Sequence, residues 1–184
     1  MKALISPVGC AVILLVVAPG GSQVKTRTPS QAVKSCSPGQ LSLGLDDEGG
    51  NFTGMSHSGT LLVLRNLGPT VCSFPARPAI RFEDAQQHAI PVTLEYPVGM
   101  HPGPVLLPVA VPVGAELTSE LRWVSADVYD GGSCLAPAFL TVTVGKDVMR
   151  VDFAGRQICG PAGRSVTYSM TPFKRDPVDT SPPS

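Results

Sequence analysis

The chain has 184 residues, and its 19 glycines and 19 prolines make long helices unfavourable over most of its length. Only 15% of the residues are charged, and 14 Lys plus Arg balance 14 Asp plus Glu, so the formal net charge is zero. A balanced charge removes the broad attraction that drives binding to nucleic acids and anionic membranes. The composition therefore argues against a helical bundle and against a nucleic-acid partner.

The first 22 residues have the composition of a secretory signal peptide. A single charge, Lys2, precedes an uninterrupted apolar run over Ala11–Ala18, and a small, turn-prone stretch follows that run. A membrane span requires about 20 apolar residues, whereas Pro7, Gly9 and Pro19 interrupt this segment. We therefore expect cleavage after position 20 or 22. The mature protein is then secreted or periplasmic, at the cell envelope, and has no stable membrane span.

Cysteines indicate a covalent framework. Cys10 precedes most of the apolar run, which disfavours its use as a lipid acceptor, and it leaves with the signal peptide. An even number remains in an exported chain, which indicates disulfides because the exterior is oxidising. Three pairings are possible, and we favour the bonds between sequence neighbours, each of which adds about 3.5 to 4 kcal/mol through loop-closure entropy. These bonds join Cys36 to Cys72 and Cys134 to Cys159.

Polar segments that contain proline border the central part of the chain. Residues 23–35 have no apolar period, and residues 171–184 contain four prolines. We therefore expect four parts: a signal peptide over residues 1–22, a flexible linker over 23–35, a β domain over 36–170 and a disordered, Pro-rich tail over 171–184.

Short runs of alternating apolar residues fill the central part and predict strands. The runs cover residues 41–45, 60–65, 79–82, 90–94, 116–124, 139–144, 148–153 and 165–170. Pro108 and Pro112 interrupt the run Val105–Val113, which suits an edge strand or an extended loop. This many short strands, without a helical pattern, predicts an all-β sandwich, with a barrel as the alternative. We expect Trp123 in the core between the sheets.

The sequence lacks the common catalytic motifs, and we expect no enzymatic activity. The three histidines lie too far apart for an H-E-x-x-H pair, and phosphate-cradling glycine patterns are absent. Ser56 lies beside His57, but residues 54–59 miss the G-x-S-x-G pattern by one position. A hydrolase is therefore the third-ranked hypothesis.

One set of side chains suggests a metal. Met55 and His57 lie in one loop and Met100 and His101 in another, and thioether plus imidazole suits copper(I). A periplasmic or extracellular copper(I) carrier is therefore the alternative function. Two acidic stretches, residues 46–51 and 127–132, do not have the spacing of a calcium-binding loop. For the leading hypothesis we expect no cofactor and no metal.

Several motifs occur in a characteristic order. They are Cys36 before Leu41-Ser42-Leu43, Arg65-Asn66-Leu67-Gly68, Cys72-Ser73-Phe74-Pro75, Leu121-Arg122-Trp123, Cys134-Leu135-Ala136-Pro137 and Ile158-Cys159-Gly160. In this order the chain resembles the secreted bacterial family known as domain of unknown function 4232, over about Cys36 to Met170. The resemblance implies an immunoglobulin-like antiparallel sandwich, export and no established enzymatic activity. The segment Phe74–Pro78 departs from the family, in which a Gly-x-Pro turn usually follows the second cysteine.

The leading hypothesis is an exported, disulfide-stabilised β-sandwich that acts as a binding or structural module of the bacterial cell envelope. Its ligand is an unidentified envelope or extracellular partner. Sandwiches display binding residues on the loops at their ends. The candidate surfaces are therefore residues 46–57, 96–105 and 128–133.

Overall fold

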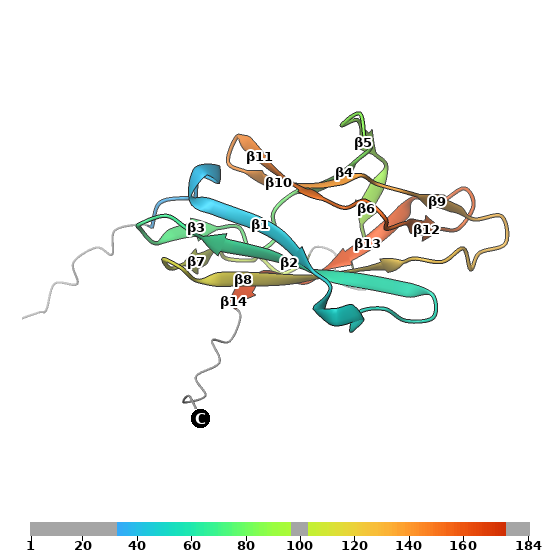
Figure 1. Ribbon diagram of the computed structural model, residues 1–184, viewed down its shortest axis with the longest axis horizontal. Helices are drawn as coiled ribbons and strands as arrows, with labels where there is room; N and C mark the ends of the chain where they lie inside the picture. The colour runs from blue at the N-terminus through green and yellow to red at the C-terminus, as the bar shows by residue number, and fades with distance from the viewer. Residues whose placement is uncertain (1–32, 97–102, 176–184) are drawn as a thin grey trace, which may run out of the picture. The chain divides into compact units, whose positions relative to one another are not determined.

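Six strands form the larger of two main sheets (Figure 1). The computed structural model describes residues 33–96 and 103–175. Five strands follow the order β1-β2-β8-β13-β6, and β14 pairs with β8 beyond the end of β13. Their bounds are β1 Leu41–Asp46, β2 His57–Asn66, β6 Val92–Leu94, β8 Glu116–Val124, β13 Val166–Met170 and β14 Lys174–Arg175.

The second main sheet has four strands in the order β11-β10-β4-β5. They are β4 Ile80–Glu83, β5 Ala89–Ile90, β10 Phe139–Val144 and β11 Asp147–Asp152. Two ribbons of three-residue strands complete the described part: β3 Cys72–Phe74 with β7 Val109–Val111, and β9 Ser133–Leu135 with β12 Ile158–Gly160.

Helical structure in the described residues is limited to two short 3-10 turns, η1 Pro38–Gln40 and η2 Glu48–Gly50. Within these residues no helix has the length and apolarity that crossing a membrane requires. The prediction of an all-β protein is therefore confirmed.

Aromatic rings connect the two main sheets. Phe82 of β4 lies edge-on to Tyr168 of β13, with ring centroids 5.1 Å apart. Phe153, which follows β11, lies 5.1 Å from Phe82 and 5.3 Å from Trp123 of β8. None of the four side chains is more than 4% exposed. Such ring pairs add about 0.5 to 1.5 kcal/mol each beyond the area they bury. Trp123 therefore packs in the core, as predicted.

Side-chain alternation explains which face of β8 joins this core. Leu117, Ser119, Leu121 and Trp123 are all buried, as the sequence pattern predicts. Successive side chains of a strand point to opposite faces, so the intervening residues of β8 face the other side of the sheet.

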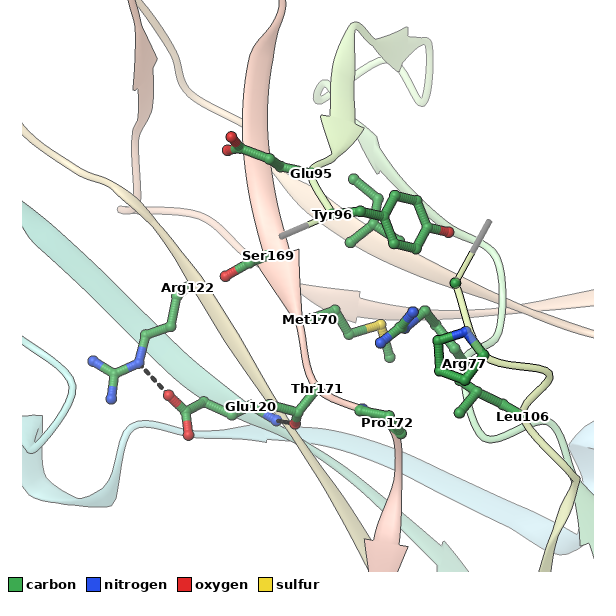
Figure 2. A pocket seen from close by; sticks show the side chains of 13 residues that line it. Arg77, Glu95, Tyr96, Leu106, Glu120, Arg122, Ser169, Met170, Thr171 and Pro172 are labelled. Atoms are coloured by element: carbon green, nitrogen blue, oxygen red, sulfur yellow. Dashed lines mark hydrogen bonds and ion pairs between the residues drawn. The ribbon is translucent and has the colours of Figure 1, made fainter. Parts of the chain in front are cut away.

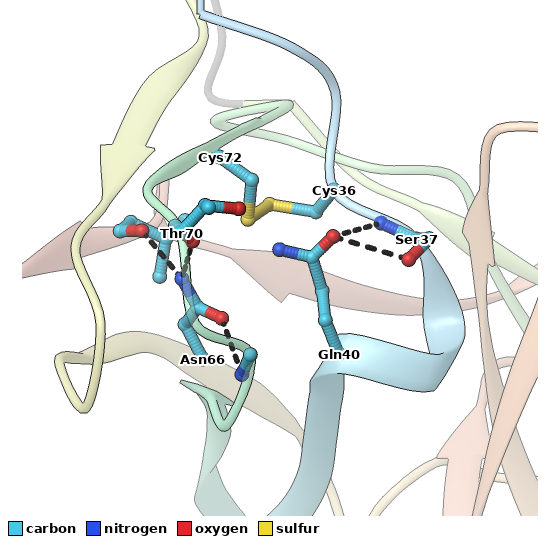
Figure 3. The surroundings of a disulfide bond; sticks show 8 residues. Cys36, Ser37, Gln40, Asn66, Thr70 and Cys72 are labelled. Carbon is cyan, nitrogen blue, oxygen red and sulfur yellow. Dashed lines mark hydrogen bonds between the residues drawn. A yellow bond between two sulfur atoms is a disulfide. The ribbon is translucent and has the colours of Figure 1, made fainter.

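The first disulfide, Cys36–Cys72, joins the start of the domain to β3 beside a buried asparagine (Figure 3). Asn66, at the end of β2, is completely buried. Its amide nitrogen donates to the carbonyl oxygens of Thr70 and Val111, at 2.8 and 2.9 Å. Its Oδ1 accepts the backbone N–H of Gly68 at 2.9 Å. One side chain therefore holds the turn between β2 and β3 and attaches this turn to β7.

The second disulfide, Cys134–Cys159, joins opposite positions of β9 and β12. Both bonds connect cysteines that are neighbours in the sequence, so the favoured pairing is confirmed. Cys10 and the rest of the predicted signal peptide lie outside the described residues.

One strand pair differs from the expected antiparallel arrangement. β6 runs parallel to β13, whereas the other ladders between named strands of the described residues are antiparallel. Parallel neighbours need a long connection, and here the whole chain between β6 and β13, including β7 to β12, separates the two strands.

The sheet structure also extends beyond both predicted ends of the domain. The predicted tail begins at Thr171, but Phe173 is only 3% exposed and β14 pairs with β8. At the other end, Ser35 of the predicted linker forms a parallel bridge with Ser73. The high proline content of the tail led us to expect disorder up to Thr171. Burial of the Phe173 ring stabilises this segment on the sheet instead.

We predict that Asn66→Ala lowers the free energy of unfolding by about 2 to 4 kcal/mol, because it leaves buried backbone groups without hydrogen-bond partners. The control Asn51→Ala removes an exposed amide and should change the free energy by less than about 0.5 kcal/mol. Urea unfolding followed by Trp123 fluorescence, with the disulfides intact, measures both. Equal stabilities of the two variants would contradict the role of Asn66.

Candidate functional site

A pocket opens at the edge of the larger sheet, where one strand ends before its neighbour (Figure 2). The ladder between β6 and β13 ends at Tyr168, while β13 continues to Met170. The pocket at this point has a volume of about 400 Å³, which is in the range of small-molecule sites. Its walls come from five parts of the chain: the ends of β6 and β13, the turn after β3, the segment that precedes β7, and the strand β8 itself.

Apolar side chains form much of the wall. They include Leu94 at the end of β6, Met170 at the end of β13, and Leu106 in the segment that leads to β7. Figure 2 shows Leu106 and Met170 close to Arg77 and Tyr96 at one side of β13. A concave, mainly apolar surface with a few polar groups is typical of a ligand-binding pocket.

Arg77 is the polar group at the centre of this cluster. Its guanidinium carbon lies over the ring of Tyr96, 5.4 Å from the ring centroid. Its Nε is buried and has no hydrogen-bond partner. A buried donor without a partner is uncommon and costs about 1 to 3 kcal/mol. The pocket therefore contains a cation whose bonding capacity the protein leaves unused.

The turn that carries Arg77 is attached to the end of β13. The backbone N–H of Phe173 donates to the carbonyl oxygen of Ala76 at 2.7 Å. The rings of Phe74 and Phe173 are in edge contact, with centroids 5.6 Å apart. These two contacts place Arg77 next to Met170, although the two residues are far apart in the sequence.

The other charged groups of the pocket already have partners. Arg122 pairs with Glu120, its neighbour on β8. The carboxylate of Glu95 accepts the hydroxyl of Thr167 at 2.9 Å, and Figure 2 shows it directed away from Arg77. Thr171 is also used, since its hydroxyl accepts the backbone N–H of Glu120 at 2.9 Å.

Tyr168 lies beside Arg77 and Tyr96, and both residues affect the pKa of its phenol. Burial raises the pKa of the Tyr168 phenol from 10.0 to about 12, with a further contribution from Tyr96, whereas the positive charge of Arg77 acts in the opposite direction. The phenol therefore remains neutral at any physiological pH.

The sequence profile of the family described as "Domain of unknown function (DUF4232)" matches residues 36–174. The chain belongs to this family. No curated protein and no solved structure matches the chain. The matched region begins at Cys36 and ends within β14, so it covers both disulfides and the whole pocket of this DUF4232 domain.

The predicted copper ligands are only partly described. Met55 is fully exposed and His57 is exposed at the start of β2, while Met100 and His101 lie outside the described residues. The copper alternative therefore stays a prediction. Ser56 Oγ lies 2.9 Å from His57 Nδ1, but in the described residues no carboxylate bonds to this histidine to complete a triad.

In the first acidic loop, two carboxylates are bonded to other groups of the protein. Asp46 accepts the backbone N–H of Glu48 at 2.8 Å, and Asp47 pairs with Arg156 at 2.6 Å. Among residues 33–96 and 103–175, no group of three or more His, Cys, Asp or Glu side chains could hold a metal ion.

The pocket cannot be recognised from the sequence pattern. Arg77 carries no recognisable motif, and its partners Tyr96, Leu106 and Met170 come from distant segments. The one signal was the segment Phe74–Pro78, at which we expected a departure from the turn that the family resemblance implies. Of the three candidate loop surfaces, residues 96–105 are the one that borders the pocket, through Tyr96 and Pro104.

We predict that one of the three tyrosines ionises only near pH 12 in the native protein. The pKa is higher in the folded than in the unfolded state, so the contribution of Tyr168 to stability is complete below pH 10 and is lost as the pH rises towards 12. Tyrosine absorbance against pH measures this titration, and Tyr168→Phe should remove its last step. Ionisation of all three phenols near pH 10 would contradict the burial of Tyr168.

Proposed function

We propose that this DUF4232 domain is an exported binding module of the bacterial cell envelope, which holds a small, largely apolar ligand in the pocket beside β13. The observation that carries the proposal is the pocket itself, a space of about 400 Å³ between Leu94, Leu106 and Met170. Pockets of this size and lining bind small molecules mainly through burial of apolar surface.

Two properties support binding rather than catalysis. Among the described residues that line the pocket there is no histidine, so the hydroxyls of Ser169 and Thr171 have no imidazole from this lining to act as a base. The adjacent pair Ser56 and His57 is exposed to solvent and does not line the pocket. A catalytic group, by contrast, must lie within hydrogen-bond reach of a bound substrate.

Export is supported by the covalent framework. The Cys36–Cys72 and Cys134–Cys159 bonds are of a kind that persists in oxidising compartments and is rare in the cytosol. The apolar N-terminal segment predicted as a signal peptide provides the route to such a compartment. A ligand of this module is therefore met outside the cytosol.

The proposal is tested by the binding of Nile red, a neutral apolar dye, to the oxidised protein, measured by fluorescence. We predict that Leu106→Trp, which fills the pocket, weakens binding at least about 10-fold. Leu107→Trp is the matched control, because Leu107 is 78% exposed and does not line the pocket; this variant should bind as the wild type does. Failure of the dye to bind, or equal binding by both variants, would contradict the proposed pocket.

A further inference from the structure

We propose that the ligand of this pocket is an amphiphile with one carboxylate, which Arg77 binds while the apolar body rests on Leu94, Leu106 and Met170. The inference rests on the proposed function and adds the chemical class of the ligand. It is carried by the unused bonding capacity of Arg77, by the state of the other charges around it, and by the contacts that fix the guanidinium in place.

The guanidinium of Arg77 lacks the partners that such a group requires. Within the described residues its Nε is buried without a hydrogen-bond partner, no ion pair joins it to an acidic side chain, and the guanidinium stacks over the ring of Tyr96. A guanidinium has five N–H donors in a planar fork that matches the two oxygens of a carboxylate. Burying such a donor group without an acceptor is unfavourable. The Arg77 side chain as a whole is half-buried, so a carboxylate in the pocket would accept hydrogen bonds from its terminal nitrogens.

Arg77 differs from the other arginines that stack on aromatic rings in its lack of an acidic partner within the described residues. Three further arginines lie over aromatic rings, at 4.6 to 5.5 Å from the ring centroid, and each pairs with an acidic side chain of the same domain. These pairs are Arg122 with Glu120, Arg150 with Glu83, and Arg156 with Asp47. Arg77 stacks in the same way, but within the described residues it has no acidic partner, and it faces a pocket instead. A ligand anion would take the place that the carboxylate holds in the other three.

The contacts around Arg77 also prepare it for binding. Its ring contact with Tyr96 orients the guanidinium, and the hydrogen bond between Phe173 and Ala76 fixes the turn that carries it. Little conformational freedom is then lost when a ligand binds, which increases affinity. The carboxylates of Glu95 and Glu120 are bonded to Thr167 and Arg122, so they do not neutralise Arg77 directly.

Three probes with the same ten-carbon chain but different charge distinguish the contribution of the carboxylate to affinity from the contribution of apolar burial. Decanoate, decan-1-ol and decyltrimethylammonium are tested below their micelle concentrations for displacement of Nile red from the oxidised protein. We expect decanoate to bind about 10-fold or more tightly than decan-1-ol, because a charge-assisted hydrogen bond contributes a factor of about 10 to 100. Decyltrimethylammonium should bind most weakly.

Substitutions then assign the preference to one arginine. Arg77→Gln should reduce decanoate affinity about 10- to 100-fold and leave decan-1-ol affinity within about 3-fold. Arg156→Gln is the matched control, since it removes the same charge from another ring-stacked arginine, which pairs with Asp47 and does not line the pocket; its decanoate preference should persist. Arg77→Lys keeps the positive charge and should retain part of the preference, and retained decan-1-ol binding verifies that each variant is folded.

The outcomes distinguish the two proposals. Equal affinities of the wild type for decanoate and decan-1-ol would overturn the carboxylate inference and leave the apolar pocket standing. A decanoate preference that survives Arg77→Gln would also overturn the inference. If neither decanoate nor decan-1-ol displaces the dye, or if the dye itself does not bind, the proposed function fails together with the inference.

Discussion

The attachment of β3 is the constraint on which the pocket depends. This strand has three residues, and the β3–β7 ribbon by itself is too small to be stable in water. The Cys36–Cys72 bond holds its first residue, and the contact between Phe74 and Phe173 holds its last. Because Arg77 follows only three residues later, these two contacts also fix the wall of the pocket. A bond that is normally considered structural thus helps to determine where the Arg77 side chain lies.

The long strands could be predicted because their burial is periodic. In β8, alternate residues from Leu117 to Trp123 are buried, and this period of two is visible in the sequence. The three-residue strands β3, β9 and β12 are too short to show a period, and each contains a cysteine of a disulfide. Their conformation comes from contacts between distant segments, which sequence pattern does not report. The presence of disulfides, in contrast, could be predicted from the even number of cysteines, and the favoured one of three possible pairings is confirmed.

The candidate site was not predictable in the same way, because its residues meet only after folding. Sequence reasoning favoured chemically conspicuous side chains such as Met55, His57 and the acidic loop at Asp47, yet Met55 points into solvent and Asp47 is paired with Arg156. Arg77 lies between two prolines and looks like a turn residue. Its significance lies in a missing partner, and the absence of a partner can be recognised only when the surrounding side chains are in place.

The disulfide framework and the pocket differ in how far the sequence motifs of the family account for them. Both disulfides and Asn66 fall within the motifs on which the family resemblance rests, whereas Arg77 lies outside those motifs. The site is tested most directly by mapping ¹H–¹⁵N chemical-shift changes of the oxidised protein during titration with decanoate. The account predicts that the changes cluster at Arg77, Leu94 and residues 169–171. Changes confined to the loops at residues 46–57 and 128–133, with none around Arg77, would contradict it.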